Sequence, residues 1–288
     1  MGNESEMSKL FFELASESRL SILHELQKEN LKMQEISRRL DVTPTEAFRQ
    51  LERLTSASLV QRMSDGTFAL AEYGKLILQI STSLDFISRH KEYFSTHDLI
   101  RLPSQFINRL GELSKTELEM DVITSLNKGT QALTEAEKYA WGIGEGSIPA
   151  QMISVMNQRV QLGIEVKMLV LEERLPTDPS IPVMPKNVEL KGLSDLPAIA
   201  VLTEKVAGIC FRQIGGRIDY AGFFGTDSIF HNWVKDFSFT IGKKESELNA
   251  NPKDSLNSLS ASHRPDIGSA AVWGWRARRN GNVRLGRR

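Results

Sequence analysis

The chain has 288 residues, of which 40% are hydrophobic, and its 36 basic and 36 acidic side chains cancel in formal charge. This composition excludes a wholly disordered chain, and the length suits roughly two domains of ordinary size. The single cysteine, Cys210, excludes an internal disulfide and a cysteine-cluster metal site. The sequence shows neither a signal-peptide pattern nor an apolar run of about 18 residues. We therefore expect a protein of the reducing cytoplasm that does not span a membrane.

Residues 8–74 begin with two predicted helices. Apolar residues between Leu10 and Leu26 recur at helical spacing, and Ser16 and Ser18 interrupt the pattern near 15–17. A short helix over 33–40 follows, after which the chain turns at 41–43.

A fourth helix and a hairpin complete this segment. Thr43 can cap the helix, Pro44 suits its first position, and Glu46 completes a capping box. Two short strands, 59–63 and 67–70, flank an Asp-Gly turn of the kind that closes β-hairpins. This order predicts a winged helix-turn-helix domain over 8–74.

The stretch EISRRLDVTPTEAFRQLERLTSASLV, residues 35–60, resembles the core of ArsR-type winged helices. It departs from that family where Ser58 replaces a usual glycine and Phe48 a usual small polar residue. The cysteines of the metal-sensing members are absent, so the resemblance implies DNA binding and no metal site.

The fourth helix would enter the major groove of double-stranded DNA. Arginine suits guanine, glutamine suits adenine, and an apolar side chain suits the thymine methyl group. The predicted base-contacting residues are Thr45, Phe48, Arg49, Gln50 and Arg53, and the predicted phosphate-contacting residues are Arg38, Arg39 and Arg62. The alternative is a solvated face in which these arginines pair with Glu46 and Glu52.

Residues 75–111 predict a long connector helix followed by a turn. Its apolar residues Ile77, Ile80, Leu84, Ile87 and Phe94 recur at steps of three and four, with Lys91 interrupting. We expect this stripe to pair two copies in a homodimer, although it equally suits packing within one chain. His97 in the turn that follows is expected to have a turn or capping role, with no metal bound.

Residues 112–242 alternate between strand and helix patterns. Strands are predicted at 111–118, 140–143, 164–171, 188–190, 198–202 and 207–211, with helices at 120–139, 149–162 and 228–238. The sequence thus predicts a mixed, α+β chain whose second domain is of the α/β type.

This region is similar to the effector domain of archaeal winged-helix regulators associated with methanogenesis. The similarity rests on HD at 97–98, PSQF at 103–106, RLGEL at 109–113, VELKGL at 188–193 and RIDY at 217–220. The strand order also resembles half of a phospholipase-D-like fold, whose enzymes need a His-x-Lys pair. No His-x-Lys occurs in the sequence, so the resemblance implies a degenerate half fold without that catalysis.

We expect the α/β domain to bind an unknown small-molecule or protein effector, without a metal or cofactor. The glycine-rich stretch at 142–146 suits an anion at a helix start, yet it lacks the lysine of a P-loop and equally suits a plain turn. The candidate effector-binding residues are Trp141, Gly144, Ser147, Arg212 and Tyr220. Cys210 is expected to be a small buried residue.

The remainder, 243–288, is rich in serine and asparagine at first and then basic, with interleaved tryptophans. It predicts a disordered tail, either with non-specific affinity for nucleic acid or without a role. Together these features predict a cytoplasmic, dimeric, sequence-specific transcriptional regulator that is not an enzyme and has no catalytic residues. The alternative is an enzyme acting on a nucleotide or phosphate, with the winged helix as a targeting module.

Overall fold

The fold is taken from a computed structural model of the chain, in which residues 2–146, 150–175 and 186–250 are described. The chain forms two compact units, unit 1 over Met1–Asp85 and unit 2 from Phe86 onward. The residues expected to form a connector are shared between these units. Ser147 and the sequence after Ala250 lie outside the described residues.

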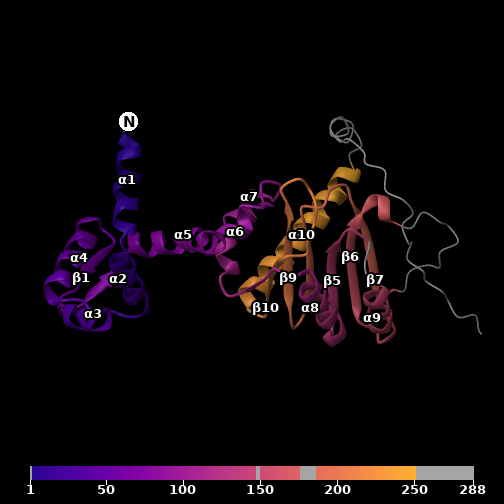
Figure 1. Ribbon diagram of the computed structural model, residues 1–288, viewed down its shortest axis with the longest axis horizontal. Helices are drawn as coiled ribbons and strands as arrows, with labels where there is room; N and C mark the ends of the chain where they lie inside the picture. The colour runs from indigo at the N-terminus through magenta and orange to yellow at the C-terminus, as the bar shows by residue number, and fades with distance from the viewer. Residues whose placement is uncertain (1, 147–149, 176–185, 251–288) are drawn as a thin grey trace, which may run out of the picture. The chain divides into compact units, whose positions relative to one another are not determined.

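Residues 2–70 of unit 1 form four helices and a hairpin in the expected order (Figure 1). These elements are α1 Gly2–Leu14, α2 Glu17–Lys28, α3 Met33–Arg39, α4 Pro44–Ser56, β1 Val60–Arg62 and β2 Phe68–Leu70. The side chain of Ser16 accepts a hydrogen bond from the backbone N–H of Arg19 and caps α2. Thr43 caps α4 in the same way, through the N–H of Glu46.

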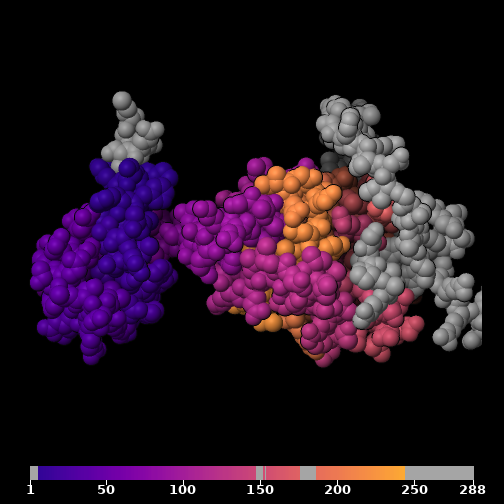
Figure 2. Space-filling model, in the orientation of Figure 1, coloured from indigo at the N-terminus to yellow at the C-terminus, as the bar shows by residue number. Residues whose placement is uncertain are grey.

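The hydrophobic core of unit 1 forms between these helices and the hairpin. Figure 2 shows the outer surface of this unit in indigo and violet. Ile22 and Leu23 of α2, Ile36 of α3 and Leu51 and Leu54 of α4 are almost fully buried in it. The helix α5, Glu72–Arg89, contributes Leu78 to this core, and Ile77 packs against it.

Unit 2 is a sheet with helices on both faces (Figure 1). Its first part comprises α6 Lys91–Phe94, β3 His97–Asp98, α7 Ser104–Ile107, the 3-10 helix η1 Leu110–Leu113, β4 Glu117–Glu119, α8 Val122–Glu135 and β5 Tyr139–Gly144. Its second part comprises α9 Ala150–Gln161, β6 Glu165–Leu171, the 3-10 helix η2 Glu172–Arg174, β7 Val188–Leu193, β8 Ala198–Thr203, β9 Ala207–Gln213, β10 Gly222–Gly225 and α10 Ser228–Ala250.

The strands follow the order β4-β10-β9-β8-β5-β6-β7, and β3 pairs with β9 outside this path. The β5–β6 and β6–β7 pairs are parallel, whereas β8, β9, β10 and β4 pair antiparallel. The sheet is therefore mixed, as the sequence predicted.

Alternate residues of each strand face opposite sides of the sheet. Ile143 and Ile209 pack with Trp233 and other α10 side chains in the main core of unit 2. Ala140 and Val166 pack with α8 and α9 in a second core. Accordingly, α10 covers one face of the sheet, and α8 and α9 cover the other.

Some predictions of individual elements were wrong. The residues 111–118 do not form one strand, because 110–113 form a 3-10 helix and only Glu117–Glu119 pair with β10. The short strand β10 was missed altogether. The helix α10 continues to Ala250, so the predicted tail is helical over its first residues, 243–250.

Candidate DNA-binding surface and ligand cavity

The helix α4 has one buried and one exposed face. Ala47, Leu51 and Leu54 anchor it in the core of unit 1. On the opposite side Thr45 is exposed, Phe48 is 47% exposed, and 72% of the Arg49 side chain is accessible. The nearest carboxylate oxygen to Arg49 belongs to Glu46, at 3.8 Å. These three predicted base-contacting residues therefore share an accessible surface.

Gln50 does not belong to this surface, although the sequence placed it there. Its amide nitrogen donates to Glu46, and its amide oxygen accepts a hydrogen bond of 3.1 Å from Arg19. Arg19 is only 6% exposed and also donates to the carbonyl groups of Phe12 and Glu13. Gln50 thus joins α4 to α1 and α2, and the sequence analysis had overlooked Arg19 as the centre of this contact.

Arg53 is held by Glu13 of α1, with Nη2–Oε1 and Nε–Oε2 distances of 2.7 and 3.2 Å. The guanidinium also lies over the ring of Phe12 at 5.1 Å. Because Arg53 donates to Glu13, the pKa of that carboxyl group is lowered, although its partial burial acts in the opposite direction. Any phosphate or base would have to compete with Glu13 for Arg53.

Arg39 is also engaged, because its guanidinium contacts Glu25 at 2.9 Å and Glu29 at 2.7 Å. A phosphate would therefore have to compete with Glu25 and Glu29 for Arg39. Arg38 and Arg62 are exposed, and neither forms an ion pair with another described residue. Of the three predicted phosphate contacts, Arg38 and Arg62 remain accessible.

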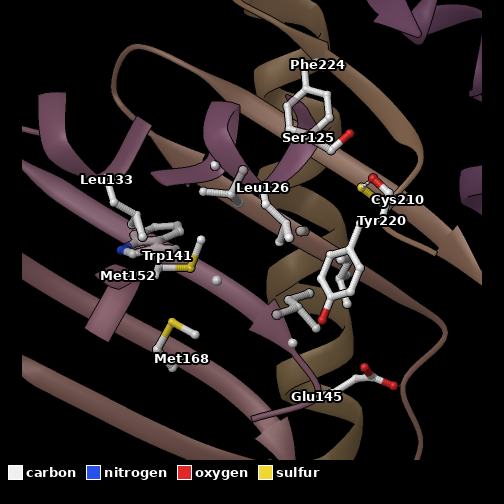
Figure 3. Close-up of a pocket in the computed structure, with 18 of the residues that line it drawn as sticks. Ser125, Leu126, Leu133, Trp141, Glu145, Met152, Met168, Cys210, Tyr220 and Phe224 are labelled. Carbon is white, nitrogen blue, oxygen red and sulfur yellow. Dashed lines mark hydrogen bonds between the residues drawn. The ribbon is translucent and has the colours of Figure 1, made fainter. Parts of the chain in front are cut away.

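Unit 2 contains a cavity of about 110 Å³ between its sheet and the helices α8 and α9 (Figure 3). Its walls are mostly apolar. They comprise Leu126 and Leu133 of α8, Met152 and Met156 of α9, Met168 of β6, Ile199 and Val201 of β8, and Phe224 of β10. No local sequence pattern indicates this cavity, because its lining residues come from seven separate helices and strands.

Glycines on the strands and on α8 make room for this cavity. A Cβ atom at Gly142 would lie 2.7 Å from the sulfur of Met168, and one at Gly208 would lie 2.6 Å from the ring of Phe224. At Gly144, by contrast, a Cβ atom would meet nothing within 4 Å. The side chains of Met168 and Phe224 thus pack directly over Gly142 and Gly208, whereas no atom occupies the space next to Gly144.

Tyr220 and Gly144 line the cavity, but two other predicted effector residues do not contribute their side chains. Trp141 borders it only through its place in β5. Its ring packs 5.2 Å from Phe239 of α10, on the opposite face of the sheet. Arg212 bonds instead to Asp195 and to the carbonyl of Gly216, each at 2.9 Å. Ser147 lies outside the described residues.

Cys210 lines the cavity but is only 5% exposed, and its thiol donates to the carbonyl of Tyr220 at 3.2 Å. Burial raises the pKa of this thiol, with a smaller contribution from Asp219. We expect iodoacetamide at pH 8 to alkylate Cys210 at least about a hundredfold more slowly in the native chain than in urea. Mass spectrometry reports this directly, since the chain has one cysteine. Equal rates in both states would contradict the buried position.

No cluster of three or more potential metal ligands occurs among the described residues. His97 stacks on Tyr93 at 3.7 Å and lies 3.3 Å from Asp219, so it is a packed side chain of β3. None of the helices in the described ranges is both long and apolar enough to cross a membrane.

No known protein family and no curated protein matches the sequence. Among solved structures, the chain is similar to TrmBL2, described as an archaeal chromatin protein with a novel mode of DNA binding. The identity is 12%, the match covers 86% of this chain and 99% of that chain, and the TM-score is 0.37. NucT from Helicobacter pylori matches 44% of this chain and 94% of its own, with 11% identity and a TM-score of 0.35.

Other matches contradict the expectation that the chain is not an enzyme. RosA, a dimethyltransferase from Streptomyces davawensis, is 10% identical over 66% of this chain and 64% of its own, with a TM-score of 0.27. The methyltransferase CalO1 and LepI in complex with SAM also match. That expectation is therefore withdrawn. At such identities and TM-scores, none of these similarities carries an argument about what this chain binds or does.

Proposed function

We propose that the chain is a sequence-specific DNA-binding transcriptional regulator whose unit 1 is a winged helix. The observation that carries this proposal is the exposed face of α4. The side chains of Thr45, Phe48 and Arg49 are accessible there, and the opposite face of the helix packs in the core of unit 1. In the major groove arginine recognises guanine, threonine can hydrogen-bond to several bases, and an apolar ring can contact the thymine methyl group. The exposed Arg62 at the end of β1 supports the proposal, because the wing hairpin of such domains contacts phosphates.

Charge in unit 1 restricts how it binds. Acidic residues outnumber basic ones between Met1 and Asp85, and Arg39 and Arg53 are already paired with glutamates. Non-specific attraction to phosphates is consequently weak, because it depends on the number of free cations. We infer that affinity depends on a few matched contacts, so that specificity is high relative to non-specific binding.

The proposal also includes a homodimer formed through α5. Ile80 and Leu84 are 60% and 56% exposed, whereas Ile87 and Phe94 of the predicted stripe pack against the core of unit 2. The exposed stripe is therefore Tyr73, Leu76, Ile80 and Leu84, shifted toward the start of α5 from the stripe that the sequence predicted. Pairing of two such stripes would give a symmetric reader of two half-sites.

The test selects double-stranded DNA from a random library with the full-length chain and then compares variants on the selected site. We expect Arg49→Ala to weaken binding by about 1–3 kcal/mol and to relax the preference at one base pair, because a bidentate contact to guanine is lost. Lys28→Ala, which removes an exposed cation of α2, is the matched control and should leave the base preference intact. Unchanged affinity and base preference in Arg49→Ala would remove α4 from the reading surface.

A further inference from the structure

The cavity of unit 2 is lined by one buried polar group that has no partner among the described residues. Ser125 of α8 is 4% exposed and lines the cavity, and its hydroxyl has no hydrogen-bond partner among the described residues. A buried hydroxyl without a partner destabilises the fold unless something else bonds to it. This hydroxyl therefore marks the cavity as a place where a ligand atom would be stabilised.

Two further polar side chains line the same cavity, Tyr220 and Glu145. Figure 3 shows Ser125, Cys210 and Tyr220 on one side of the view, with Glu145 below them, while Leu133, Met152 and Met168 occupy the other side. Tyr220 is held in the left-handed backbone region, with φ of 61°. Such a conformation is unfavourable for tyrosine, and it occurs where the surroundings fix the side chain in place.

Glu145 and Tyr220 influence one another. Partial burial raises the pKa of Tyr220, and the negative charge of Glu145 raises it further. The phenol therefore stays protonated at neutral pH beside a carboxylate that accepts hydrogen bonds. Together they offer a donor and an acceptor at one end of an otherwise apolar space.

The charge of the lining excludes one class of ligand. Among the described residues that line the cavity, Glu145 is the one charged group, and none is lysine or arginine. Arg174 packs its side chain against Gly146 but does not line the cavity. A phosphate or carboxylate would be desolvated without a cation beside it, which is strongly unfavourable.

The volume of the cavity indicates that its ligand is a small molecule. An apolar cavity of about 150 Å³ accommodates benzene. The cavity here is smaller, about 110 Å³, but three methionines border it, and their flexible side chains can move to admit a ring. A single aromatic ring or a short branched alkyl group suits this volume.

We propose that this cavity binds a small, mainly apolar amine or alcohol, with its ring or alkyl body against Met152, Met156 and Met168. Its polar end bonds to Glu145 and Tyr220, and an anionic molecule of the same size is excluded. This inference goes beyond the proposed DNA binding of unit 1 and gives a ligand class to the effector that the sequence led us to expect for unit 2.

The test uses three probe molecules that share a phenyl ring and differ in charge: benzylamine, benzyl alcohol and benzoate. Each is titrated into the full-length chain without DNA and followed by calorimetry and thermal shift. We expect benzylamine and benzyl alcohol to bind, with benzylamine about tenfold tighter, because its donor is charge-assisted. Benzoate should not bind. Failure of both benzylamine and benzyl alcohol to bind, or binding of benzoate as tight as that of benzylamine, would overturn the proposal.

Variants locate the binding in the cavity. Gly144→Leu fills open space without meeting a neighbour within 4 Å of its Cβ, so it should fold and weaken binding of both ligands at least tenfold. Glu145→Gln should remove the advantage of benzylamine over benzyl alcohol. Glu173→Gln, at an exposed carboxylate outside the cavity, is the matched control and should bind like the parent. Unchanged binding in both Gly144→Leu and Glu145→Gln would place the ligand elsewhere and overturn the assignment.

Ser125→Ala gives an independent readout. It removes the buried hydroxyl without a partner, so the chain without ligand should unfold at a higher temperature than the parent. If the variant is instead less stable, the hydroxyl already has a partner, and the argument from Ser125 fails. Because all these measurements omit DNA, they remain informative even if the DNA-binding proposal fails, and the DNA selection needs no ligand.

Discussion

Replacing Ile80 and Leu84 together by aspartate is expected to give a folded monomer that binds its DNA site about a hundredfold more weakly or worse. Both side chains are more than half exposed, so unit 1 itself does not need them for folding. Two carboxylates in an apolar stripe would repel their counterparts in a second copy. Loss of the dimer removes the effective concentration that links two half-sites. Sedimentation velocity and binding to the selected site measure both effects.

The matched control carries the same two charges elsewhere on α5. Gln79 and Thr82 are exposed and lie off the apolar stripe, so Gln79→Asp with Thr82→Asp should remain dimeric. An unfolded Ile80/Leu84 variant would show that the stripe packs within one chain. A parent protein that sediments as a monomer while bound to DNA would contradict the proposed homodimer directly.

Gly74→Ala is expected to destabilise unit 1 by about 3 kcal/mol or more, since overpacking against backbone cannot be relieved by a rotamer change. Gly74 is buried near the start of α5, and a Cβ atom there would lie 2.1 Å from the carbonyl oxygen of Leu59. The same carbonyl accepts the N–H of Ala71, so it cannot move without losing that bond. Urea unfolding measures the loss, and faster amide exchange in α2 and α4 assigns it to unit 1.

Gly129→Ala is the counterpart in a helix of unit 2. Its Cβ atom would make an ordinary contact of 3.7 Å with Met152, and glycine within a helix is about 0.5–1 kcal/mol less favourable than alanine. This substitution should therefore stabilise the chain slightly. If Gly74→Ala and Gly129→Ala change the free energy of unfolding in the same direction and by the same amount, the predicted clash between a Cβ atom at Gly74 and the carbonyl of Leu59 is contradicted.

Local signals explain which parts of the fold could be predicted. The capping residues at Thr43–Glu46 and the apolar run of β6 act over neighbouring residues, and the structure contains both elements at those places. β10 contains only four residues, of which the first and last are glycines, and its stability comes from pairing with β4 and β9. Such a segment has no sequence pattern of its own.

Long-range pairing also explains why the surroundings of the candidate residues could not be predicted. Arg53 suited a base contact by its place on α4, but Glu13, which is 40 positions earlier, holds it. The cavity of unit 2 depends on side chains missing from Gly142 and Gly208, on two strands that are not neighbours. Neither feature follows from periodicity or from the spacing of residue types.

The closure of unit 2 has a consequence for its synthesis on the ribosome. The hydroxyl of Tyr93 donates to the carbonyl of Ala221, 128 residues later, and accepts from the N–H of Phe211. β4 likewise pairs with β10, which lies much later in the chain, so β4 cannot form this pair until β10 has been synthesised. Until the chain has been synthesised past these residues, the side chains of Phe86, Tyr93 and Phe106 cannot be buried in their core. This stretch of the nascent chain therefore exposes hydrophobic side chains. Pairings of such long separation form slowly, so we expect them to limit the rate at which unit 2 folds.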